Sequence, residues 1–378
     1  MRKKIWLSSP HMGGSEMKYI QEAFDENLIA PLGSNVNGLE RDLETYLGEG
    51  VYVAALSSGT AALHIALILS GVERGDFVIC QSLTFSASAN PIVYLGAHPI
   101  FVDSEKDTWN LCPNAVEDAI KFGISKGKKP KAIIAVCLYG MPYKVEEIQA
   151  LSLRYDIPVI EDSAEALGSR YKNQKCGTFG DLSVISFNGN KIITTSVGGC
   201  LTAKNEEFKN KAVFLATQAK DNAVHYEHTS IGYNYRMSNI CAGIGRGQME
   251  MLKERINQRR ANHQFYKKLF QDNPLLTLHT EPTADYFSNH WLSVAYLSPE
   301  LGITRAELIQ EFTNQEIETR PIWKPMHLQP IFKNTVFFGS DLSEKLFSNG
   351  LCLPSGSNLS DADRNRIAKV FDIVKMIK

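Results

Sequence analysis

The stretch Ser186-Phe187-Asn188-Gly189-Asn190-Lys191 joins two apolar runs, 181–187 and 199–203, that read as strands. Most lysines are solvated surface residues, often on the polar face of a helix. Lys191 instead has small and polar neighbours on both sides and lies between strands. A lysine in a partly enclosed site has a lowered pKa and becomes nucleophilic. This setting predicts a reactive amine on an irregular segment that a sheet holds in place.

An acidic residue accompanies this lysine. Asp162 lies 29 residues before Lys191, at the end of the apolar run 158–161. Ligands of open α/β sheets bind at the carboxyl ends of strands, although an aspartate there can also be the N-cap of a helix beginning at Ala164. An amine that forms a Schiff base with a cofactor aldehyde needs a carboxylate across the ring to keep the pyridine nitrogen protonated. The pair therefore predicts a pyridoxal phosphate site.

Short β-rich runs alternate with helical patterns over the first two-thirds of the chain. The runs that precede Lys191 are 51–56, 77–80, 99–102, 132–138 and 158–161. This alternation predicts an α/β fold with a largely parallel sheet and crossover helices. The remainder mixes strands such as 291–296 with helices such as 305–312 and 362–376. We expect a large domain over residues 1–252 and a smaller α+β domain over residues 253–378.

A helical pattern runs from 238 to 270 and predicts one long helix that bridges the two domains. Gly243-x-Gly245-x-Gly247 fits part of a dinucleotide-binding pattern, but it lies inside this helix and follows no strand, so it indicates close helix packing. The pair His225-x-x-His228 has no evident third ligand, and its neighbours suggest a loop. We therefore expect no metal site.

Composition restricts the class of protein. The chain has 378 residues, a formal net charge of −1 and 44% apolar residues, which describes a soluble globular protein of about two domains and not a nucleic-acid binder. The apolar segment after the basic start is too short for a signal peptide, and no apolar stretch could span a bilayer. The seven cysteines are scattered and form no CxxC motif, which indicates reduced thiols and a cytoplasmic location.

Two further segments lie just after predicted strands. Ser57-Ser58-Gly59-Thr60 opens the apolar helix 61–69, and a helix N-terminus with free amide donors and hydroxyls is a ready anion site. Such residues also cap helices that bind nothing. Phe85 could stack on a planar ring, or could simply belong to the core.

Taken together, these segments resemble the sugar aminotransferases of the DegT/DnrJ/EryC1/StrS group, which are fold type I pyridoxal phosphate enzymes. The resemblance covers nearly the whole chain. The matching stretches are 27–33 (NLIAPLG), 58–63 (SGTAAL), 161–168 (EDSAEALG), 186–191 (SFNGNK), 232–238 (GYNYRMS), 325–330 (PMHLQP) and 353–356 (LPSG).

The resemblance implies a role for each matching residue. Lys191 would form the Schiff base with the cofactor, Asp162 would pair with the pyridinium nitrogen, and Phe85 would cover one face of the ring. The remaining expected cofactor contacts are Ser58, Gly59, Thr60, Glu165, Ser186, Asn188 and Asn234. Among these, Asn234 would reach in from the other subunit, which implies a homodimer with shared sites. Glu165 departs from the Gln or His of many relatives, and Val197 from their Gly or Glu.

The implied reaction has two halves. An amino donor, in this group usually L-glutamate, would leave its amine as pyridoxamine phosphate and depart as an oxo acid. The second half would aminate a keto sugar, with Lys191 delivering a proton to the sugar carbon, and the kinetics would be ping-pong. Related dehydratases generally carry histidine in place of the lysine, so Lys191 argues against them. A non-catalytic sensory or regulatory protein on the same fold is the alternative of another class.

The segments 27–33, 188–190 and 323–327 most resemble enzymes that aminate C4 of UDP-4-keto-6-deoxy-N-acetylglucosamine, for the biosynthesis of bacillosamine-type glycans. A GDP-linked or dTDP-linked 4-keto-6-deoxyhexose is the alternative substrate. The expected contacts near the sugar nucleotide are Ile29, Trp323, Lys324 and His327, with a place on the rim as their alternative.

Overall fold

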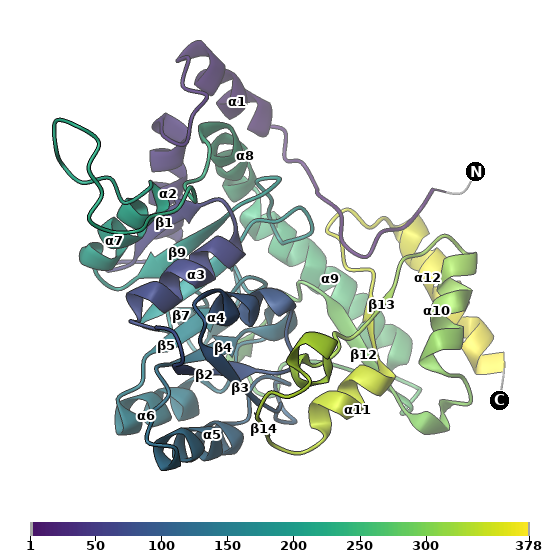
Figure 1. The fold of residues 1–378 in the computed structure, drawn as a ribbon. Coiled ribbons are helices and arrows are strands. Elements are labelled where there is room, and N and C mark those ends of the chain that lie inside the picture. Colours follow the sequence, from purple (N-terminus) through teal and green to yellow (C-terminus); the bar gives the residue numbers. More distant parts are fainter. Residues whose placement is uncertain (1–2, 377–378) are drawn as a thin grey trace.

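An eight-stranded sheet forms the centre of the computed structural model, which describes residues 3–376 (Figure 1). In spatial order its strands are β1 (Tyr52–Leu56), β9 (Gly199–Ala203), β8 (Leu182–Ser186), β5 (Val159–Asp162), β4 (Ala132–Val136), β2 (Phe77–Gln81), β3 (His98–Val102) and β14 (Phe337–Phe338). Within the described residues, five of the seven pairings are parallel, and β9 runs antiparallel to both of its neighbours. The expectation of a largely parallel sheet in an α/β fold is confirmed.

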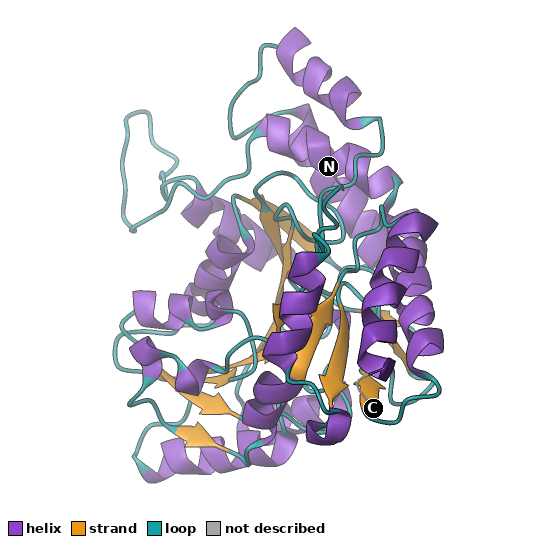
Figure 2. Ribbon diagram, turned by 90° about the vertical axis from the view of Figure 1, so that its right-hand side faces the viewer, coloured by secondary structure: helices purple, strands orange, loops and turns teal. Residues whose placement is uncertain are grey.

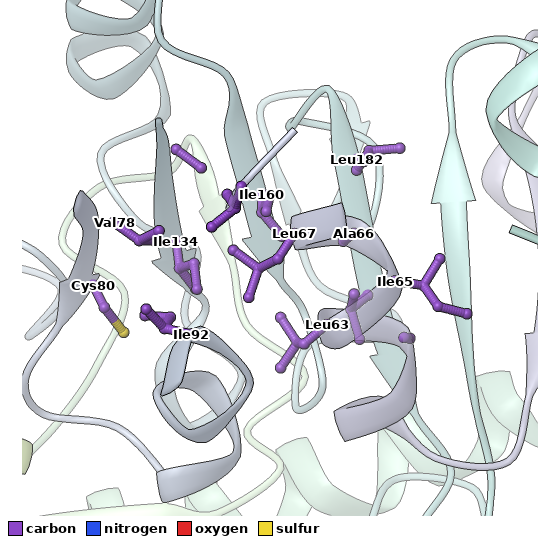
Figure 3. Packing of buried hydrophobic residues seen from close by; sticks show 14 of the residues in the cluster. Leu63, Ile65, Ala66, Leu67, Val78, Cys80, Ile92, Ile134, Ile160 and Leu182 are labelled. Carbon is purple, nitrogen blue, oxygen red and sulfur yellow. The ribbon is translucent and has the colours of Figure 1, made fainter. Parts of the chain in front are cut away.

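Helices cover both faces of this sheet. α3 (Gly59–Leu69), α4 (Asn90–Tyr94) and α7 (Glu206–Ala216) lie on one face, whereas α5 (Pro113–Ser125) and α6 (Val145–Tyr155) lie on the other. α2 (Ser34–Leu47) packs beside β1. Because parallel strands are buried on both sides, they read as continuous apolar runs. Figure 3 shows Leu63 and Leu67 of α3 packed toward Ile134 and Ile160 of the strands, which fixes the helix whose first turn follows β1.

A second, four-stranded sheet lies in the C-terminal part. Its order is β10 (Leu276–Leu278), β12 (Ser293–Leu297), β15 (Gly350–Leu353) and β13 (Arg320–Pro321). Its apolar cluster includes residues of α9 (Leu252–Phe270), α10 (Arg305–Asn314) and α12 (Asp361–Met376), and α11 (Leu342–Asn349) also packs on this sheet. We refer to this part as the small lobe. The boundary at residues 252 and 253 stays a prediction.

The remaining elements are short. A three-stranded ribbon consists of β11 (Tyr286–Phe287), β6 (Arg170–Tyr171) and β7 (Gln174–Lys175). Single 3₁₀ turns are η1 (Ser86–Ser88), η2 (Leu138–Gly140), η3 (Pro299–Leu301), η4 (Met326–Leu328) and η5 (Pro330–Phe332). Across the described helices of residues 3–376, none is both long enough and apolar enough to cross a membrane.

The expected single helix over 238–270 is wrong in one respect. The structure has two helices, α8 (Asn239–Glu250) and α9, interrupted at Met251. The two helices have different partners: α8 packs on α1 (Glu16–Asp25) and α2, whereas α9 runs on toward the small lobe (Figure 1). Met251 keeps right-handed helical dihedral angles, so hydrophobic periodicity continues across the break and does not reveal it.

The glycines of α8 confirm the expected close packing. A Cβ at Gly247 would lie 2.7 Å from the backbone nitrogen of Glu16, and one at Gly243 would lie 3.1 Å from the carbonyl carbon of Tyr19. The segment between α7 and α8 is a loop, as expected for His225 and His228, and it extends away from the body of the molecule (Figures 1 and 2).

Candidate active site

A cavity of about 920 Å³ lies between the ends of the large sheet and the small lobe. It contains most of the residues that the sequence singles out. Those that line it are Ser58, Gly59, Thr60, Phe85, Asp162, Glu165, Ser186, Asn188, Lys191, Trp323 and Lys324. These residues come from separate segments of the chain, so the fold brings together what the sequence places far apart.

The N-terminus of α3 forms an anion cradle at one side of the cavity. Ser58 ends the loop after β1 and caps the helix, its Oγ accepting a hydrogen bond from the backbone N–H of Ala61 at 3.0 Å. A Cβ at Gly59 would lie 3.1 Å from the Cβ of Ser186, so glycine lets the helix start approach the end of β8. Backbone N–H groups and hydroxyls converge here, which suits a phosphate group.

Asp162 is buried at the carboxyl end of β5. Its Oδ1 accepts a hydrogen bond from the backbone N–H of Ala164 at 3.1 Å, and its Oδ2 accepts one from the Ser88 hydroxyl at 2.7 Å. Burial raises the pKa of this carboxyl, and the two hydrogen bonds and the charge of Lys191 act in the opposite direction. The residues after Ala164 form a turn in place of the helix that the capping alternative supposed.

No cation among residues 3–376 forms an ion pair with Asp162. A buried carboxylate in this position is ready to accept a hydrogen bond from a protonated ring nitrogen. No sequence pattern indicated the residue that orients this carboxylate. Ser88 lies in η1, and its hydroxyl is 2.8 Å from that of Thr84, so a short chain of hydroxyls holds the carboxylate in place.

Lys191 points into the same cavity. Its Nζ lies 3.2 Å from Oε1 of Glu165 and 4.1 Å from the ring centroid of Trp291, and its side chain is only 12% exposed. Burial raises the pKa of Glu165 to about 7, although the neighbouring Lys191 charge and a hydrogen bond from the Tyr139 backbone N–H act to lower it. Glu165 can therefore carry or release a proton near neutral pH.

Three residues that the sequence did not indicate fix the backbone beside Lys191. The Trp291 indole N–H donates to the Asn190 carbonyl at 2.7 Å, and the Ser8 hydroxyl donates to the same oxygen at 2.6 Å. Arg259, which is buried on α9, donates to the Ser8 hydroxyl at 2.9 Å and to the Lys191 carbonyl at 3.4 Å. The lysine loop is thus held by the N-terminal segment and by the small lobe.

Three expected contacts do not line the cavity. Ile29 is half-exposed before α2, and Asn234 is exposed on the loop before α8. His327 lies with its Nδ1 2.6 Å from the Ser82 hydroxyl, and its ring stacks on Phe337 at 3.8 Å. The functions expected of these residues stay predictions.

The family model of the DegT/DnrJ/EryC1/StrS aminotransferases matches residues 10–372. The chain belongs to this family. The expected family, fold type and class of enzyme are thereby confirmed: the protein is an aminotransferase that uses pyridoxal phosphate and acts on nucleotide-linked sugars. The lysine, the buried carboxylate and the anion cradle described above fit this cofactor.

The chain resembles curated relatives over almost its full length. It is 48% identical over 375 residues (98% of this chain, 96% of the relative) to EpsN of Bacillus subtilis, whose assignment as a pyridoxal phosphate-dependent aminotransferase is itself provisional. It is 38% identical to the GDP-perosamine synthase of Escherichia coli O157:H7 (95% of each chain). It is 30% identical to the UDP-4-amino-4,6-dideoxy-N-acetyl-β-L-altrosamine transaminase of Campylobacter jejuni (87% and 86%).

Solved structures show the same fold. The pyridoxamine phosphate form of the sugar aminotransferase Spr1654 from Streptococcus pneumoniae, an assignment that is also provisional, superposes with a TM-score of 0.90 at 26% identity, over 99% of this chain and 98% of that one.

Proposed function

We propose that this aminotransferase transfers the amino group of L-glutamate to C4 of UDP-4-keto-6-deoxy-N-acetylglucosamine, for the biosynthesis of a surface glycan. The observation that carries the proposal is that Lys191 and Asp162 line one cavity, and that this cavity continues past them to Trp323 and Lys324. Its volume of about 920 Å³ is at the upper end for ligand pockets, which suits a cofactor together with a large second ligand.

The residues have distinct proposed roles. The Ser58–Thr60 turn and Ser186 hold the phosphate, Asp162 keeps the pyridine nitrogen protonated, and Phe85 covers the ring. When bound, pyridoxal phosphate supplies an electron-accepting ring. The Lys191 amine takes a proton from the α-carbon of the donor amino acid and later gives a proton to C4 of the sugar. Glu165, next to Lys191, holds a proton or releases it near neutral pH.

Two nucleotides, UDP and GDP, are candidates for the nucleotide part of the sugar substrate. The Campylobacter relative, named for a UDP-linked amino sugar, supports uridine, as does the resemblance of segments 27–33, 188–190 and 323–327 to UDP-sugar enzymes. The higher identity to a GDP-perosamine synthase favours a GDP-linked 4-keto-6-deoxyhexose as the second candidate. Both candidate substrates have a keto group at C4, the carbon to which Lys191 would deliver a proton.

We further propose a cytoplasmic homodimer in which Asn234 contacts the cofactor of the partner. The loop before α8 supports this arrangement, because Val224, Tyr226 and Ile231 extend apolar side chains that are more than 80% exposed. All seven cysteines are free, as expected for a reducing compartment. Sedimentation of the holoenzyme tests the dimer.

The decisive experiment is the visible spectrum of the protein loaded with pyridoxal phosphate. L-glutamate should bleach the band of the bound cofactor, and UDP-4-keto-6-deoxy-N-acetylglucosamine should restore it. Restoration by a GDP-linked 4-keto-6-deoxyhexose alone would replace the substrate proposed here by the second candidate. Bleaching that neither sugar reverses would contradict both proposed sugar substrates. Failure of L-glutamate to bleach the band would contradict its assignment as the amino donor.

A further inference from the structure

Two buried histidines and a half-buried glutamate meet where α9 packs against the small sheet. His263 lies on α9, Glu281 follows β10, and His290 precedes β12. One nitrogen of each imidazole and one carboxylate oxygen lie within 4.8 Å of one another. We refer to these three residues as the histidine cluster. None of them lines the active-site cavity, so the cluster is separate from the site described above.

His263 is buried without a polar partner. The residue is 1% exposed, and within residues 3–376 neither of its ring nitrogens has a hydrogen-bond partner. Its ring instead stacks on that of His290, with 3.5 Å between the centroids. A buried nitrogen without a partner destabilises the folded chain, because water would bind that nitrogen in the unfolded chain. A metal ion between the side chains would give His263 the missing partner.

The spacing of the cluster approaches that of a zinc site. Ligand atoms around a tetrahedral zinc ion lie ~2.1 Å from the ion and therefore about 3.4 Å from one another. Nε2 of His290 and Oε1 of Glu281 are already 3.2 Å apart. The planes of the two imidazoles differ by only 3°. The ring of His263 must therefore tilt away from that of His290 before both rings can direct a nitrogen at one ion.

The charges around the cluster include one cation that opposes a metal ion. The Arg260 guanidinium donates to Oε1 of Glu281 at 2.6 Å, and the Ser288 N–H donates to the same oxygen at 3.3 Å. A carboxylate can also bind through its second oxygen. Burial lowers the pKa of His263 and of His290, which favours the neutral imidazole that a metal requires. The two imidazoles and the carboxylate together supply the ligand set.

The chain on either side of His290 connects the cluster to the active site. The Asn289 amide donates to the Glu165 carbonyl at 2.9 Å, and the Trp291 indole donates to the Asn190 carbonyl at 2.7 Å. His290 lies between these two residues with a φ of 47°, which residues other than glycine seldom adopt. A metal bond to His290 would therefore hold in place a segment that contacts both Glu165 and the lysine loop.

We propose that the histidine cluster binds a zinc ion, with His263, Glu281 and His290 as its ligands, and that the ion fixes α9 to the segment beside the active site. Imidazole and carboxylate are both common ligands of zinc. Sequence spacing did not indicate this site, because Glu281 and His290 follow His263 by 18 and 27 residues and match no zinc motif. The proposal does not depend on the identity of the sugar substrate.

Calorimetric titration of the holoenzyme with zinc chloride, after treatment with EDTA, tests the proposal. The wild type should bind one zinc ion per chain, and its thermal midpoint should rise with zinc. His263→Gln and Glu281→Gln should each weaken zinc binding by about 100-fold. Loss of a group that only orients a ligand already weakens metal binding by about 10–100-fold, so loss of a ligand should have at least the larger effect.

Two variants are matched controls. His228→Gln removes an exposed histidine of the loop before α8. Cys176→Ser changes the other group in the described structure that is close enough to hold an ion, which consists of Cys137, Glu161 and Cys176. Both controls should bind zinc with the affinity of the wild type.

Three results would overturn the proposal. The first is a wild-type holoenzyme that binds no zinc. The second is an unchanged zinc affinity in both His263→Gln and Glu281→Gln. The third is loss of binding in Cys176→Ser but not in His263→Gln, because the ion would then lie among the cysteines. Bleaching by glutamate and its reversal by a sugar enter none of these results, so they test the proposed function separately.

Discussion

The surroundings of Asp162 act on the charge of this buried side chain in opposite directions. Burial raises the pKa of this carboxyl, and the Ser88 hydroxyl opposes that shift by donating to the ionised form. A hydrogen bond to a charged group contributes about 1.5–3 kcal/mol. Ser88 therefore favours the ionised carboxylate that the proposed pairing of Asp162 with the ring nitrogen requires.

Ser88→Ala should move the acid limb of the kcat–pH profile to higher pH, because losing the donor raises the pKa of Asp162 further. The expected loss of activity is thus larger at pH 6 than at pH 8. Ser86→Ala, in the same 3₁₀ turn, is the matched control, since no side-chain hydrogen bond is seen for Ser86 in the described structure. An acid limb that stays in place would show that another group controls it.

At the scale of residues, the sequence indicated those candidate site residues whose neighbours in the chain form a recognisable pattern. Asp162 ends one apolar run and Lys191 follows another by four residues, and in both places a strand could be inferred. Ser8 and Trp291 escaped prediction because they meet Asn190 only through the tertiary fold, from opposite parts of the chain. No local pattern encodes such a contact.

At the scale of elements, α8 depends on its glycines. A Cβ at Gly247 would lie 2.7 Å from the backbone nitrogen and 2.8 Å from the Cα of Glu16, where only a backbone shift could relieve the overlap. Overpacking of this kind lowers the free energy of unfolding by about 1–3 kcal/mol. The higher helix propensity of alanine raises it by roughly 1 kcal/mol.

Gly247→Ala should therefore lower the free energy of unfolding by on the order of 1 kcal/mol in urea titrations. Gly38→Ala in α2 is the comparison: the three atoms nearest to its Cβ belong to the side chain of Arg246, which can shift at the expense of its contacts with Asp42 and Asn35, whereas at Gly247 the nearest atoms are backbone. Equal free energies of unfolding for the Gly247 variant and the wild type would mean that α1 and α8 can move apart without loss of stability.

Seven strands of the large sheet, β12 of the small lobe and the helices over 61–69, 305–312 and 362–376 followed from the sequence, and their bounds agree within a few residues. The break at Met251 did not follow, because it depends on what each half of the helix packs against. β14 was also missed, since two residues that pair with β3 are too short to leave a pattern.

At the scale of the whole molecule, buried histidines set the response to acid. Burial lowers the pKa of His263 to about 2, and the imidazole stacks on His290 at 3.5 Å. An unfolded chain takes up this proton near pH 6.5. Below that pH the unfolded state therefore binds more protons than the folded state, and stability declines as the pH falls toward 2.

His263→Phe should reduce the decline in unfolding free energy between pH 6 and pH 4 by up to about 1.4 kcal/mol per pH unit. Tyr266→Phe, one turn along α9, is the control: it removes a hydrogen bond to the Pro354 carbonyl and should lower stability at every pH alike. Parallel pH curves for wild type and His263→Phe would show that His263 is protonated in the folded protein.

The pairing of Ile5 with Ile317, and of β14 with β3, has a consequence for the order of events on the ribosome. The large sheet is incomplete when residues 1–252 have been synthesised, because β3 pairs with β14 and Ile5 pairs with Ile317, and both partners are made later. Until then the nascent chain presents an open strand edge, which invites pairing with other chains. Completion of the sheet is therefore a late step in synthesis, and chains that terminate before β14 would keep this edge open and be prone to aggregate.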